Sequence, residues 1–226
     1  MVVEPAPREP DCETRMSMRD PTVHTPSSPN RPYAAATPTK PKKLEPHEFA
    51  RWVDARAEGL AERWLADVRA RHTRWNQGIQ TLLGRFFSVF TSMLGTSLGP
   101  YREQVEPLWL QAAELFGSVA AQRGLAVGEA VEEFQILREV VIRALYADPP
   151  AEGKSPIPLR DLLRLNRVID RGVTQVSVGH ADVLFFALFQ GTGAPEHIDD
   201  PLIAEMTSQL RSIDAEFRAV MRSQKR

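Results

Sequence analysis

The chain has 226 residues, of which 42% are hydrophobic and 25% are charged, a composition typical of a soluble globular protein with one domain. Its formal net charge of −1 excludes a whole-molecule electrostatic bias towards nucleic acid or acidic membranes. The single cysteine, Cys12, excludes an intramolecular disulfide and a zinc site built from cysteines.

The N-terminal segment, residues 1–43, is rich in proline: ten of the eighteen prolines lie between Pro5 and Pro46. Such a segment cannot bury enough apolar area to offset the entropy lost on ordering, so we predict a disordered tail. It lacks the apolar stretch of a secretory signal. Its seven Lys or Arg outnumber its five Asp or Glu, which leaves open a scaffold function in which this basic tail tethers the protein.

From Leu44 onwards apolar residues recur at helical spacing, which predicts helices joined by short turns. Gly95 and Gly99 are expected to end the second helix, and Pro107 to kink or restart the third. The apolar stripe from Phe49 to Val68 is expected to belong to a single helix. The first five expected helices span about 47–72, 75–94, 101–123, 127–147 and 156–190.

A last helix is expected within residues 198–224, with Asp200 as its N-cap before Pro201. Its apolar residues are spaced 3, 4, 3, 4, 3, a period that keeps a narrow seam facing a partner helix. We therefore predict a coiled-coil-like helix that forms a homodimer contact, with packing on its own domain as the alternative. The predicted seam consists of Ile203, Met206, Leu210, Ile213, Phe217 and Val220.

Six helices with short turns and no convincing strand predict an all-α fold, either a multi-helix bundle or a globin-like packing. No window approaches the about 18 consecutive apolar residues of a membrane span, so we expect a cytoplasmic protein without one. The most apolar run, Val183 to Phe189, is expected to be a buried helix end. The predicted core includes Trp75, Phe86, Phe90, Leu137, Val141, Leu165, Ile169 and Val173.

Motifs for common enzyme chemistry are absent: the sequence has no phosphate-binding loop, no nucleophile elbow and no His-Glu-x-x-His pair. We therefore predict a protein that is not an enzyme and holds no cofactor. One alternative rests on His180, which lies ahead of the aromatic cluster Phe185, Phe186 and Phe189. An inward histidine in a helical bundle can bind haem iron or another metal, although a packing role is commoner.

The helix expected over 127–147 carries a concentrated set of polar residues. Because positions three and four apart are neighbours on a helix, these side chains can reach one another. The set is either a solvated face with ordinary ion pairs or a patch that binds a partner protein. The candidate partner-binding residues are Glu132, Gln135, Arg138 and Glu139.

Three segments together carry a family resemblance: Leu108-Trp109, Glu133-Phe134-Gln135-Ile136-Leu137-Arg138-Glu139 and Asn166-Arg167-Val168-Ile169-Asp170. Over about residues 48–190 the chain resembles the RsbR-type N-terminal domains of stressosome co-antagonists and related input domains of bacterial sensor histidine kinases. The resemblance implies that residues 44–191 form a helical, often dimeric sensor domain without catalytic activity. Because few residues follow this segment, the resemblance implies that the output of the signalling pathway lies on a separate chain.

Overall fold

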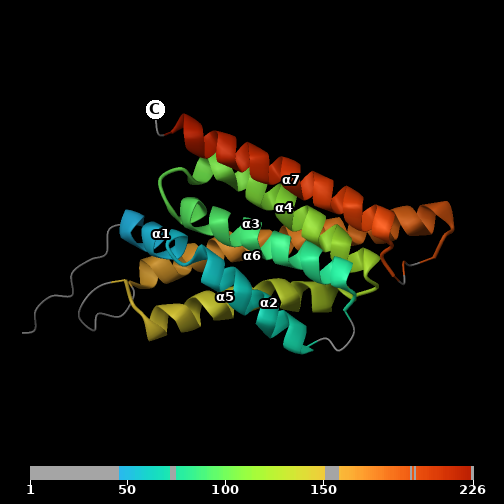
Figure 1. Ribbon diagram of the computed structural model, residues 1–226, viewed down its shortest axis with the longest axis horizontal. Coiled ribbons are helices and arrows are strands. Elements are labelled where there is room, and N and C mark those ends of the chain that lie inside the picture. The colour runs from blue at the N-terminus through green and yellow to red at the C-terminus, as the bar shows by residue number, and fades with distance from the viewer. Residues whose placement is uncertain (1–45, 72–74, 151–157, 194, 196, 225–226) are drawn as a thin grey trace, which may run out of the picture. The chain divides into compact units, whose positions relative to one another are not determined.

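The computed structural model describes residues 46–71, 75–150, 158–193, 195 and 197–224, and all regular secondary structure in these residues is helical (Figure 1). The predicted all-α, multi-helix bundle is confirmed, whereas the likeness to globins stays a prediction. The predicted disordered tail, residues 1–43, lies outside the described residues. The helices are α1 (Pro46–Asp54), α2 (Ala57–Arg71), α3 (Gln77–Leu98), α4 (Arg102–Gln122), α5 (Val127–Ala147), α6 (Leu159–Gln190) and α7 (Asp200–Ser223).

The stripe that we expected to form one helix is divided between α1 and α2, so that prediction is wrong. The break is a turn at Ala55 and Arg56, where the sequence has neither glycine nor proline. Tertiary contacts hold α1 at the end of α5: the indole of Trp52 donates to the carbonyl oxygen of Asp148 at 2.9 Å, and Arg56 pairs with the Asp148 carboxylate. The break therefore follows from contacts distant in the sequence, which helical spacing cannot indicate.

Helix α3 begins at a side-chain cap, because the Asn76 side chain accepts a hydrogen bond from the backbone N–H of Ile79 at 2.7 Å. It continues to Leu98, past Gly95, which we expected to end it. A Cβ on Gly95 would overlap the carboxylate of Asp54 in α1. Glycine at this position therefore allows α1 to approach α3 closely, and does not stop the helix.

The centre of the bundle is aromatic. The ring of Trp64 stacks on Phe87 at a centroid distance of 3.9 Å. Phe90 lies 5.1 Å from Phe134 and 5.2 Å from Trp109, in both cases edge to face. Of the predicted core, Trp75 and Val173 are only half-buried, and the buried members are Phe86, Phe90, Leu137, Val141, Leu165 and Ile169.

Helices α4 and α6 cross with their backbones in close contact. A Cβ on Gly117 would lie 2.0 Å from the carbonyl oxygen of Val176, and one on Gly179 would lie 2.0 Å from that of Glu114. Only glycine fits at both places, so the crossing is fixed by backbone contact. Helix α4 runs through Pro107 without a break, because its packing outweighs the one backbone hydrogen bond that proline removes.

Helix α7 lies along α3 and α4 (Figure 1). Its N-cap is Asp199, one residue before the expected Asp200, and the Asp199 carboxylate accepts from the backbone N–H of Leu202 at 2.9 Å. The face of α7 that is turned towards α3 and α4 is apolar. Its buried residues are Met206, Leu210, Ile213 and Phe217.

Candidate functional site

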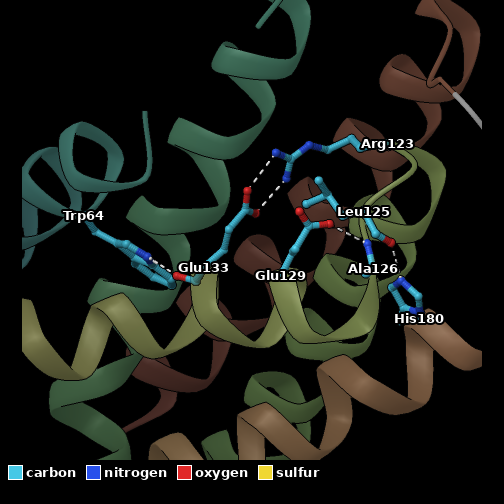
Figure 2. Close-up of polar contacts among 7 residues, drawn as sticks. All are labelled: Trp64, Arg123, Leu125, Ala126, Glu129, Glu133 and His180. Carbon is cyan, nitrogen blue, oxygen red and sulfur yellow. Dashed lines mark hydrogen bonds and ion pairs between the residues drawn. The ribbon is translucent and has the colours of Figure 1, made fainter. Parts of the chain in front are cut away.

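A buried ion pair closes the turn between α4 and α5 (Figure 2). The two terminal nitrogens of Arg123 donate to the two carboxylate oxygens of Glu133 at 2.7 and 2.8 Å, and the two side chains are 5% and 2% exposed. The guanidinium also lies 5.6 Å from the centre of the Trp75 ring. A buried pair of this kind adds little net stability, but removing one partner leaves an uncompensated buried charge.

The backbone around this ion pair is also hydrogen-bonded. The indole N–H of Trp64 in α2 donates to the carbonyl oxygen of Glu133 at 2.8 Å. The carboxylate of Glu129 accepts from the backbone N–H of Ala126 at 2.8 Å, which satisfies a donor at the start of α5. Figure 2 shows these groups around one turn. These hydrogen bonds link α2, α4 and α5, so their role is structural.

His180 in α6 belongs to the same cluster (Figure 2). It is buried, and its Nε2 lies 2.7 Å from the carbonyl oxygen of Leu125. Because a carbonyl oxygen only accepts, Nε2 carries the proton and is not free to ligate iron or another metal. No group of three or more His, Cys, Asp or Glu within the described residues could hold a metal ion. Binding of haem or metal through His180 would have to use Nδ1, and that alternative stays a prediction.

The predicted partner-binding residues do not form one cluster. Arg138 is half-buried and pairs with Asp170 of α6, and Glu139 accepts from Arg143 at 2.8 Å. The Glu139–Arg143 contact is an ordinary ion pair within a helix, whereas the Arg138–Asp170 contact links α5 to α6. The three members that are exposed along one side of α5 are Glu132, Gln135 and Glu139. A role in partner binding stays a prediction for these three.

Sequence reasoning missed Arg123 and Glu133 as members of a polar cluster. A signal was present at Glu133, since it lies three residues after Ala130 and four before Leu137, which both face the core. A charged residue at a core position is rarely buried without a partner. Its partner, Arg123, lies beyond the turn at the C-cap of α4, and spacing along α5 alone could not identify it.

The predicted dimer seam of α7 packs within the chain. Four of its six members are buried against α3 and α4, and the outer two are half-buried. A homodimer that used this seam would therefore require α7 to leave its own bundle. That contact stays untested as a prediction for Ile203, Met206, Leu210, Ile213, Phe217 and Val220.

The C-terminal end of α6 carries large apolar side chains that remain in water, contrary to the expected buried helix end. Its last turns extend past the neighbouring helices (Figure 1), and no other helix of the described residues covers them. Phe185 stacks on Phe189 at 6.5 Å and meets Phe186 at 6.1 Å. We call this surface the α6 apolar end; it consists of Leu184, Phe185, Phe186, Leu188 and Phe189, all exposed.

Helix α6 is also long and apolar enough, by length and composition alone, to cross a membrane. Of the 18-residue stretch of α6 that is apolar enough, 22% is buried in the structure. Core helices of soluble proteins pass the same test, so one such helix is a weak indication. The expected absence of a membrane span stays untested.

No family model, no curated protein and no solved structure matches this chain. The resemblance to RsbR-type domains therefore stays a prediction.

Proposed function

We propose that the chain is a non-catalytic adaptor that works through protein–protein contact, with the α6 apolar end as the contact surface. The exposure of this end is the observation that supports the proposal, since Phe185, Phe186 and Phe189 are 64%, 61% and 83% exposed. Burying one phenylalanine side chain stabilises by about 1.5–3 kcal/mol. A contiguous apolar patch of this kind is typical of an interaction site.

The partner that we propose for this surface is a second copy of the same chain. No charged residue lies between Val183 and Pro195, so two copies can meet here without repulsion between like charges. A two-fold contact places the same surface on both sides. Two copies bury six phenylalanines, roughly 9–18 kcal/mol of apolar burial, against an association cost of roughly 4–15 kcal/mol. A reversible homodimer is feasible on these magnitudes.

The pathway part of the proposal rests on the resemblance. An RsbR-type domain would act in the cytoplasm of a bacterium as a sensor whose output lies on a separate signalling protein. In that arrangement the dimer leaves the polar side of α5, with Glu132, Gln135 and Glu139, free for that protein. Contact with it through a polar, exposed face would be weak and reversible, as a signalling contact requires.

Sedimentation equilibrium of the full chain tests the self-contact. We compare the wild type with the double variant Phe186→Ser/Phe189→Ser. The control is Tyr146→Ser in α5, because Tyr146 and Phe189 are each 83% exposed. We expect the wild type and the control to sediment as dimers and the double variant as a monomer, since only the double variant loses apolar area from the contact.

Two results would overturn the self-contact. A wild type that remains monomeric at tens of micromolar rules it out, and its co-sedimentation with lipid vesicles would then assign the α6 apolar end to a membrane surface. A dimer that persists in Phe186→Ser/Phe189→Ser but dissociates in Leu210→Asp/Phe217→Asp would show that the dimer contact is formed by α7.

A further inference from the structure

Four arginines gather around a small cavity between the end of α3, the start of α4 and the first half of α6. Arg164, Arg167 and Arg171 are spaced three and four residues apart, which places them on one face of α6. Arg102, the first residue of α4, faces them across the cavity. We call this set, Arg102, Arg164, Arg167 and Arg171, the arginine cluster.

The charge around this cavity is not balanced. Its wall contains one acidic residue, Glu106, which pairs with Arg171 and lies 3.6 Å from Arg102. Four arginines and one glutamate leave three positive charges on the wall, and the buried carboxylate of Asp161 beside Arg164 reduces the local excess to two. Arg164 lies 3.8 Å from Asp161, a distant pairing, and Arg167 forms no ion pair with the described residues. The cavity therefore carries a positive potential, which favours the binding of an anion.

A buried donor without a partner lies on the same wall. Trp109 is 1% exposed, and its indole N–H has no hydrogen-bond partner among the described residues. Most buried donors in folded proteins are hydrogen-bonded, so an unpartnered one beside a cavity indicates a place for an acceptor. A Cβ on Gly172 would lie 3.0 Å from this indole nitrogen and 2.6 Å from the ring of Phe134, so glycine allows α6 to pack closely against Trp109.

The start of α4 adds to the positive potential. Its N-cap, Tyr101, makes no side-chain hydrogen bond to the helix, so the first backbone N–H groups of α4 lack a side-chain acceptor. The N-terminus of a helix is electropositive and attracts anions. Arginine guanidinium groups match the oxygens of phosphate in pairs of parallel hydrogen bonds.

We propose that the arginine cluster binds a phosphate group, either as inorganic phosphate or on a small phosphate monoester. The enclosed space of about 20 Å³ is close to the size that holds a single water. The phosphate therefore lies at the mouth, among the exposed side chains of Arg167 and Arg171. The space beside the buried N–H of Trp109 holds at most one water and not the phosphate itself. This site is independent of the α6 apolar end and of any dimer.

Titration calorimetry of the full chain at low salt tests this site, with inorganic phosphate in one arm and phosphoserine in the other. We compare the wild type with Arg167→Gln, chosen because it breaks no ion pair among the described residues, and with Arg167→Lys. The control is Arg69→Gln, an exposed arginine on α2. Circular dichroism confirms that each variant is folded.

The wild type should bind at least one of the two ligands, and Arg167→Gln should weaken that binding about tenfold, since one charge-assisted contact is lost. Arg167→Lys should recover part of the loss, and Arg69→Gln should leave binding unchanged. Equal binding of the two ligands would show that the site recognises the phosphate group alone. Binding of only one would show whether the site takes inorganic phosphate or a phosphate monoester. No binding by the wild type, or equal weakening by Arg69→Gln, overturns the proposal.

Discussion

Helix α6 passes through two regions that follow opposite patterns. At His180 it takes part in a buried polar cluster whose hydrogen bonds are made within the chain, whereas five residues later, at Phe185, its apolar side chains lie in water. Burial in this bundle therefore follows from what lies beside a residue, and not from its chemical type. The polar cluster completes the fold, while the α6 apolar end contributes little to it and is the surface that we propose for contact with a second copy.

Breaking the buried cluster should give the largest loss of stability. Glu133→Ala leaves the guanidinium of Arg123 buried without its partner, and we expect a loss of about 3–5 kcal/mol in the free energy of unfolding. Glu132→Ala, at the exposed neighbouring position, should change it by less than about 0.5 kcal/mol. Guanidinium chloride unfolding of both variants measures the difference, and similar losses would show that the ion pair is not buried in solution.

A pair of phenylalanines sharpens the same comparison. Phe90 is enclosed by other aromatic rings, so Phe90→Ala should cost about 3–5 kcal/mol in the free energy of unfolding. Phe189 lies in water, so Phe189→Ala should cost less than about 0.5 kcal/mol when unfolding is measured on dilute, monomeric protein. A comparable loss at Phe189 would mean that the α6 apolar end packs within its own chain.

The smallest effect on the free energy of unfolding is expected at Asp54. Its carboxylate is less buried than the polar cluster and more buried than the α6 apolar end. The residue as a whole is exposed, but partial burial of its carboxylate beside Gly95 of α3 raises its pKa from 3.8 to about 6. Because the folded state then binds the proton more tightly than the unfolded state, the stabilisation is full below the unfolded pKa and is lost as the pH rises through the folded one. The stability of the wild type relative to Asp54→Asn should fall between about pH 4 and pH 6. A flat difference across this range would place the carboxylate in water.

Helix ends were predictable from the sequence where local chemistry determines them. The expected helix over 127–147 matches α5, and the expected end of α6 at Gln190 is confirmed. At that end Gly191 adopts a φ of 69°, a left-handed conformation that glycine takes readily and that terminates many helices. Helix-end signals of this kind depend only on residues close in the sequence, so they can be recognised from one sequence alone.

The site was less predictable, because helical spacing shows which face is apolar but not what covers it. The seam of α7 has a period of 3.5, yet α3 and α4 of the same chain cover it. The apolar run at the end of α6 is expected to be buried on composition, yet among the described residues its large side chains from Leu184 to Phe189 are exposed. The break after Asp54 and the partnership of Arg123 with Glu133 likewise depend on tertiary contacts.

Hydroxyl-radical footprinting of the aromatic side chains tests the proposed self-contact most directly, because it measures whether another copy covers the α6 apolar end. The account predicts that the reactivity of Phe186 and Phe189 falls as the protein concentration rises, while that of the equally exposed Tyr146 stays constant. Reactivity at Phe186 and Phe189 that is high at every concentration would contradict the account, since the α6 apolar end would then remain in water.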